Sequence, residues 1–65
     1  MKSYKMVKNG NCYIKFEVDE KEGVVRISWC NGKMRMWQQK DAIIFINQAR
    51  SRWRQYIDEG YERVR

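Results

Sequence analysis

The side chains that could carry out chemistry in this chain are carboxylates and thiols. Its 65 residues include eight Asp and Glu and two Cys but no His. General acid–base catalysis needs a histidine or paired carboxylates held in a pocket. Here Glu17 falls in a predicted strand, residues 19–22 fall in a predicted turn, and the others lie on or after a predicted helix. Because these carboxylates form no constellation, we predict no enzymatic activity, no bound cofactor and no metal.

The two cysteines are predicted to stay reduced. Residue parity places Cys12 on the inner face of the predicted sheet and Cys30 on its outer face, so that their Cβ atoms point apart and cannot form an unstrained disulfide. Cys12 is interpreted as a small core residue. Cys30 would face Lys33, which could lower the pKa of its thiol, but the chain has no histidine to act as a base.

Cations outnumber anions, and this imbalance indicates a class of partner. The chain has 14 Lys and Arg against eight Asp and Glu, a formal net charge of +6. Such a balance favours polyanionic partners such as nucleic acid or an acidic protein surface. No apolar run reaches the ~18 residues of a membrane span, and the N-terminus does not begin a signal peptide. We therefore expect a cytoplasmic protein that does not bind membranes.

Binding residues need a scaffold, and the first two thirds of the chain predict one made of strands. Apolar and polar residues alternate there, which is typical of antiparallel strands with one solvated face. The predicted strands are residues 3–8, 12–19, 24–30 and 33–38.

Two turns set the predicted register. A three-residue loop at 9–11 would put Tyr4 and Met6 on the same face as Ile14 and Phe16. The dipeptide Asn31-Gly32 predicts a two-residue type I′ hairpin. Counting outward from that hairpin, inward residues would meet inward residues. The predicted inner face then comprises Tyr4, Met6, Ile14, Phe16, Val18, Val25, Ile27, Trp29, Met34 and Met36.

One long helix is predicted at residues 39–59. Its apolar residues recur at steps of three and four and form one stripe. Gly60 is predicted to end it, with Tyr61 folding back on Tyr56 as in a Schellman motif. The stripe comprises Ala42, Phe45, Ile46, Ala49, Trp53, Tyr56 and Ile57. We predict one α+β domain over residues 1–65, a three- or four-stranded antiparallel meander with one C-terminal helix packed on one face. The pattern does not assign residues 61–65.

The outer face of this sheet is the first candidate site. It carries five basic residues and one acidic residue, and two aromatic rings stand among them. Rings can stack on bases and cations can contact phosphates, which is the chemistry of single-strand recognition. An equally weighted alternative is that Arg26 stacks on Trp37 while Glu17 neutralises it. The predicted nucleic-acid-binding residues, with single strands slightly preferred over duplex, are Lys5, Tyr13, Lys15, Arg26, Lys33, Arg35 and Trp37.

A second candidate surface lies at the start of the predicted helix, away from the core stripe. Apolar and basic side chains there would leave apolar surface in contact with water. This indicates a protein contact, either with another protein, as in an adaptor or inhibitor, or with a second copy in a homodimer, which would also help a chain of this size to bury enough surface. The residues of this contact are Ile43, Ile44, Asn47, Arg50 and Arg54.

The predicted architecture and one segment of the predicted helix each resemble known proteins. The order of four strands and then a helix resembles the architecture of the positive cofactor 4 and PUR-type single-strand-binding modules, and the basic sheet also resembles the three-stranded AP2 and integrase-arm modules that enter the major groove. The segment from Ala49 through Trp53 and Tyr56 to Gly60 and Tyr61 is similar to the ending of small picocyanobacterial and cyanophage proteins. That similarity implies a small accessory or phage-encoded protein, which could act on a host protein.

Overall fold

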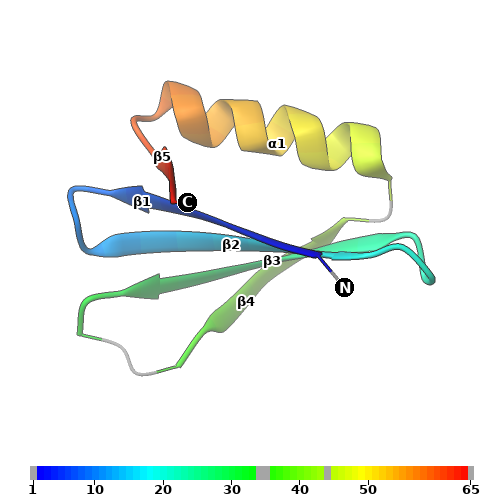
Figure 1. Ribbon diagram of the computed structural model, residues 1–65, viewed down its shortest axis with the longest axis horizontal. Coiled ribbons are helices and arrows are strands. Elements are labelled where there is room, and N and C mark those ends of the chain that lie inside the picture. The colour runs from blue at the N-terminus through cyan, green and yellow to red at the C-terminus, as the bar shows by residue number, and fades with distance from the viewer. Residues whose placement is uncertain (1, 34–35, 44, 65) are drawn as a thin grey trace.

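The computed structural model describes residues 2–33, 36–43 and 45–64, with the backbone alone described at residues 41 and 42. It contains an antiparallel sheet with the strand order β4-β3-β2-β1-β5 and one helix packed on one face (Figure 1). The predicted α+β fold is therefore confirmed. The elements are β1 (Lys2–Lys8), β2 (Cys12–Asp19), β3 (Val24–Asn31), β4 (Gln38–Ile43), α1 (Ile46–Asp58) and β5 (Glu62–Val64).

The first hairpin forms as predicted. Tyr4 pairs with Phe16 and Met6 with Ile14 across β1 and β2. The turn between the strands contains Asn9 at φ 57° and Gly10 at φ 74°. Asn and Gly are the residues that adopt this left-handed conformation most readily, so the turn sequence selects this register.

The predicted hairpin at Asn31-Gly32 is wrong, and so is the predicted strand at 33–38. β3 continues to Asn31, whose side-chain oxygen accepts a hydrogen bond from the N–H of Lys33 at 2.9 Å. Gly32 lacks the positive φ that a type I′ turn requires. The chain instead returns through a longer connection, and Trp29 pairs with Gln38 rather than with Met34.

The predicted helix start at residue 39 is also wrong. Residues 38–43 form β4, in which Ile43 pairs with Val25 of β3. A helix there would leave the edge of β3 unpaired, so the backbone ladder outweighs the helical spacing of the apolar residues. The helix begins at Ile46, after Phe45, which makes no side-chain capping hydrogen bond.

The end of α1 is confirmed. Gly60 has φ 106°, and the N–H of Tyr61 donates to the carbonyl of Tyr56 at 3.0 Å. This is the long hydrogen bond of a Schellman motif. The chain then reverses into β5, within the tail that the sequence pattern does not assign, and Val64 pairs with Lys5 of β1.

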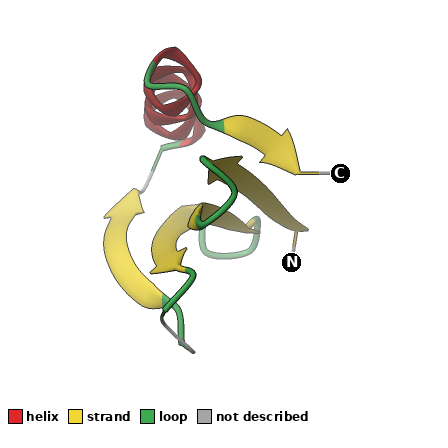
Figure 2. Cartoon of the chain, turned by 90° about the vertical axis from the view of Figure 1, so that its left-hand side faces the viewer, coloured by secondary structure: helices red, strands yellow, loops and turns green. Residues whose placement is uncertain are grey.

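The core lies between α1 and the inner face of the sheet, and β4 and β5 lie on either side of the helix (Figure 2). The Phe16 ring packs edge-on against Trp53 at 5.1 Å and against Tyr56 at 6.1 Å between centroids. The buried apolar residues are Met6, Ile14, Phe16, Val25, Ile27, Ile43, Ala49 and Tyr56.

Three predicted core residues of the sheet are exposed, and the first of them is Tyr4, at 36%. Trp29 is 38% exposed because its cross-strand partner is Gln38, an exposed polar residue at the end of the ladder. Met36 is exposed because it belongs to the β3–β4 connection and not to a strand. On the helix, Ile57 is also exposed. Met34 lies outside the described residues.

The cysteine prediction is confirmed. Cys12 pairs with Asn31 and Cys30 pairs with Tyr13, so the two thiols lie on opposite faces of neighbouring strands. Both are free cysteines. In the described part of the chain, no helix has the length and apolar character needed to cross a membrane.

Candidate functional site

The outer face of the sheet brings together three of the predicted binding residues. Lys5 of β1 pairs with Lys15 of β2, and Tyr13 of β2 pairs with Val7 of β1. Paired residues of an antiparallel ladder share a face. Lys5, Tyr13 and Lys15 therefore lie together on the side of the sheet that faces away from α1.

Trp37 lies over this group, although not in the way the sequence predicts. Its ring centroid is 4.6 Å from Nζ of Lys15 and 6.0 Å from Nζ of Lys5. Trp37 immediately precedes β4, so the β3–β4 register brings it back across the sheet. The expected contact between Arg26 and Trp37 is wrong, because the ring engages two lysines of β1 and β2 instead.

Lys15 is the most engaged of the predicted cations. Besides the Trp37 ring, its Nζ contacts a carboxylate oxygen of Glu17 at 3.5 Å, and its side chain is only 17% exposed. The sequence pattern of the outer face predicts Lys15 to lie in a basic patch with no acidic neighbour, and this contact shows that prediction to be wrong. Glu17 and Lys15 point to the same face because they are two residues apart on one strand. Lys15 therefore holds Trp37 in place and is poorly available to a ligand.

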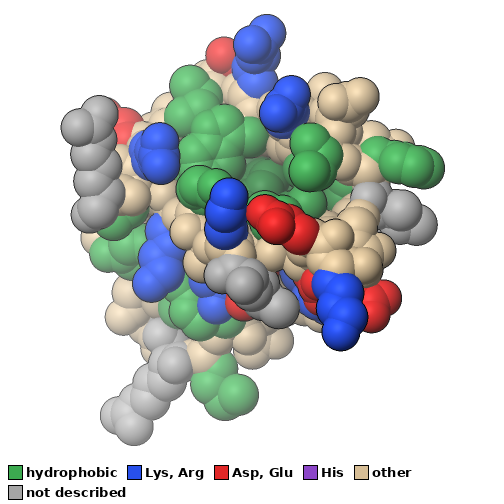
Figure 3. Space-filling model, turned by 45° about the vertical axis from the view of Figure 1, so that its right-hand side comes forward, with side chains coloured by type: hydrophobic (Ala, Val, Ile, Leu, Met, Phe, Trp, Pro, Cys, Tyr) green, Lys and Arg blue, Asp and Glu red, His purple; other side chains and the backbone are tan. Residues whose placement is uncertain are grey.

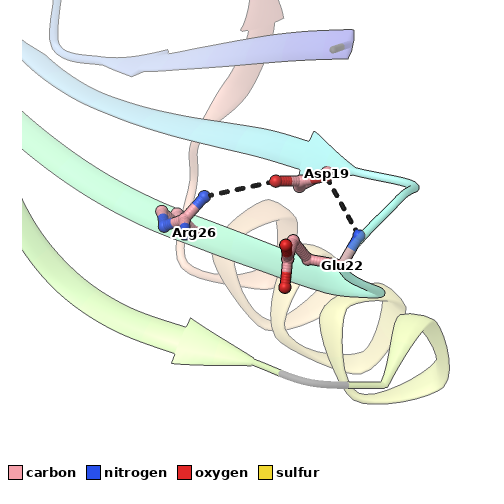
Figure 4. A network of polar contacts seen from close by, with 3 residues as sticks. All are labelled: Asp19, Glu22 and Arg26. Carbon is pink, nitrogen blue, oxygen red and sulfur yellow. Dashed lines mark hydrogen bonds and ion pairs between the residues drawn. The ribbon is translucent and has the colours of Figure 1, made fainter.

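Arg26 is occupied by a different carboxylate. Its guanidinium lies 3.8 Å from one oxygen of Asp19, whose other oxygen accepts a hydrogen bond from the backbone N–H of Glu22 at 3.1 Å (Figure 4). Glu17 is opposite Arg26 in the ladder, but its carboxylate contacts Lys15. Arg26 thus belongs to the β2–β3 turn network and lies apart from Trp37.

A pocket opens beside Trp37 on the outer face. It has a volume of about 410 Å³, within the range typical of small-ligand sites. The hydroxyl of Tyr13 donates to the carbonyl of Gly10 at 3.3 Å, which orients its ring. The residues that line the pocket are Lys5, Tyr13, Cys30, Asn31, Gly32, Trp37 and Val64.

Four lining residues lie outside the predicted site, namely Cys30, Asn31, Gly32 and Val64. Val64 comes from β5, in a tail whose alternation is the one signal that could have identified it. Asn31 ends β3 instead of forming a hairpin turn. Among the remaining predicted residues, Lys33 is exposed, and Arg35 lies outside the described residues.

No protein-family model, curated protein or solved structure matches this chain significantly. The function is therefore inferred from the chemistry of its own side chains.

The second candidate surface, at the start of the helix, is partly wrong. Ile43 is 7% exposed in β4 and belongs to the core, so it cannot contact a partner. Ile44 lies outside the described residues. The remaining three, Asn47, Arg50 and Arg54, are exposed on α1.

Two apolar residues that the sequence assigned to the core stripe are exposed at the same place. Phe45 is 64% exposed and Ile46 is 50% exposed. Phe45 precedes the helix and Ile46 is its first residue, so the later start of α1 moves both side chains away from the core.

In the described residues, no three His, Cys, Asp or Glu side chains gather closely enough to hold a metal ion.

Proposed function

We propose that the outer face of the sheet binds single-stranded nucleic acid, with one base in the pocket beside Trp37. The observation that supports this most directly is that Tyr13, Trp37 and Lys5, all predicted from sequence as binding residues, line one pocket. Stacking of a base on an aromatic ring contributes ~1–3 kcal/mol. The amide of Asn31 adds hydrogen-bonding capacity at the pocket wall.

The cations have different roles in this proposal. Lys15 fixes the Trp37 ring from beneath, and the side chain of Arg26 is held by Asp19. Lys5 and Lys33 are exposed and supply the phosphate contacts. A single strand suits the pocket better than a duplex, because only an unpaired base can leave the stack without breaking a base pair.

The test is a fluorescence-anisotropy titration of a labelled oligothymidine and of a duplex of the same length, at several salt concentrations. The double variant Lys5→Glu/Lys33→Glu is expected to weaken single-strand binding at least tenfold and to lower the salt dependence, because two phosphate contacts are lost. The matched control is Arg50→Glu/Arg63→Glu, which changes net charge equally on the other side of the sheet. If both variants weaken binding equally, affinity reflects net charge and the outer-face site is wrong.

The alternative is a protein-binding adaptor or inhibitor that docks through the helix start, and the exposure of Phe45 favours it. A partner would cover Phe45, Asn47 and Arg54. Docking of a second copy over the same residues would make a homodimer. Phe45→Asp is expected to abolish such association in light scattering or partner capture and to leave oligonucleotide binding unchanged.

A further inference from the structure

A groove lies on the inner side of the sheet, between the start of α1 and the first half of β1. Its volume is about 460 Å³. Figure 3 shows this end of the molecule, where hydrophobic side chains gather between basic and acidic ones. The groove is on the opposite face from Trp37, so it is separate from the proposed nucleic-acid site.

The groove has an apolar floor and aromatic walls. Phe16 and Val25 are buried beneath it, whereas Tyr4 and Ile46 remain partly exposed along its sides. Trp53 packs edge-on against Phe16 at 5.1 Å and against Tyr4 at 6.3 Å between centroids. These ring contacts hold the walls in place, so a bulky apolar side chain could enter without rearrangement of the core.

One side of the groove is an unpaired strand edge. β5 pairs only with Lys5, Met6 and Val7 of β1, and no strand among the described residues pairs with the same edge at residues 2–4. Alternate residues of a strand direct their N–H and C=O groups to the same neighbour. The first half of β1 therefore offers backbone hydrogen bonds to an added strand.

The rim of the groove is cationic. Arg50 has no ion pair among the described residues, and the guanidinium of Arg63 lies over the Tyr4 ring at 5.7 Å. Lys2 is paired with Glu20 at 3.5 Å, which leaves the two arginines as the net charge. Guanidinium groups bind carboxylates in preference to apolar or basic groups.

We propose that this groove binds an extended acidic peptide as an added strand on β1, in line with β5. Side chains of an added strand alternate between the two faces of the sheet. One apolar side chain would enter between Tyr4, Ile46 and Trp53, and acidic residues two positions before and after it would reach Arg50 and Arg63. A free backbone edge beside the groove favours a peptide over a nucleic acid, which has no strand hydrogen bonds to offer.

The test uses a blocked, fluorescein-labelled heptapeptide, Thr-Glu-Thr-Phe-Thr-Glu-Thr, whose Glu and Phe side chains would face the groove together. Fluorescence anisotropy is expected to give saturable binding. Replacing both Glu by Lys, replacing Phe by Ala, or N-methylating the Thr residues that flank Phe should each weaken binding about tenfold, because each removes one of the three recognised features.

The same two protein variants serve here as in the nucleic-acid test, but the arginine variant is now the test and the lysine variant is the control. Arg50→Glu/Arg63→Glu should weaken peptide binding at least tenfold, whereas Lys5→Glu/Lys33→Glu, with the same net charge, should leave it unchanged; circular dichroism checks that both fold. Absence of peptide binding, or equal loss in both variants, overturns the proposal. So does an oligothymidine whose binding is lost in the arginine variant only, since the groove would then hold nucleic acid. The two proposals fail independently because they lie on opposite faces.

Discussion

Both faces of the sheet carry cationic and aromatic side chains, but the faces differ in whether the cations already have an ion-pair partner. On the outer face, Lys15 is already bound to Glu17 and to the Trp37 ring. On the inner face, the Arg50 side chain at the groove has no ion pair among the described residues. Engaged cations fix a ring in position, and free cations remain available to a ligand. The outer face therefore presents the fixed ring of Trp37, whereas the groove presents the Arg50 guanidinium and the unpaired backbone edge of β1.

The comparison also separates stability from binding. The inner face contains the core, in which Met6, Val25 and Ile27 are the most deeply buried side chains. The outer face has a single ring over two lysines. We expect substitutions on the inner face to affect folding strongly and those on the outer face to affect it weakly.

The largest effect is expected for Ile27→Ala. Ile27 is fully buried, and its truncation leaves a cavity beneath α1. The free energy of unfolding should fall by about 2–5 kcal/mol in urea denaturation. Lys33→Ala, at an exposed position, should change it by no more than about 0.5 kcal/mol. A small effect of Ile27→Ala would mean that the core does not lie between this strand and the helix.

Trp37→Ala should have an intermediate effect. It removes the ring from Lys15 and Lys5, and contacts of this kind contribute about 0.5–1 kcal/mol each. A loss of about 1–2 kcal/mol in the same denaturation experiment is expected. A loss as large as that of Ile27→Ala would make the outer face a second core, and no loss would mean that Trp37 is not held against the sheet.

The two Asn-Gly sequences offer a sharper comparison, because they decide which residues reach each face. Gly10→Ala places a side chain at φ 74° and should cost about 1–2 kcal/mol. Gly32→Ala should cost less, because Gly32 has no positive φ and the added methyl, 3.3 Å from Cβ of Asn11, requires only a small shift of that exposed residue. Equal losses of stability for both variants in thermal denaturation would indicate that Asn31-Gly32 forms the predicted tight hairpin.

The smallest effect concerns pH. Burial raises the pKa of Tyr61 above its ordinary value of 10.0, and the Cys12 and Glu59 charges act in the same direction. The folded state then keeps the proton longer than the unfolded state does, so this stability is complete below pH 10 and is lost as pH rises through the higher folded pKa. In urea denaturation between pH 9 and 11, Tyr61→Phe should lose less stability than the parent chain. An identical decline in both would contradict the raised pKa of Tyr61.

Local patterns predicted the parts of the fold that depend on local chemistry. Residues 9–11 select a register because Asn and Gly tolerate positive φ, and Gly60 ends the helix for the same reason. The same chemistry was misleading at Asn31-Gly32, where the pairing of Asn31 with Cys12 extends β3 through the predicted turn. Pairing between distant strands carries no signal in a single local window.

The candidate site was predictable to a similar extent. Lys5, Tyr13 and Lys15 follow from alternation along two strands with a correct register. The position of Trp37 depends on the β3–β4 register, which was wrong, so its contacts with the two lysines could not be predicted. The groove combines residues of β1, β2, β3, α1 and β5, and no sequence pattern links those elements.

The pairing of β5 with β1 joins strands that lie far apart along the chain. Glu62, Arg63 and Val64 complete a ladder with a strand that the ribosome makes more than fifty residues earlier. While the helix is still being synthesised, that edge of β1 has no partner, and β5 must leave the exit tunnel before the ladder can close. Contacts of such long sequence separation form slowly, so we expect this ladder to close last, after the β1–β2 and β2–β3 hairpins have formed.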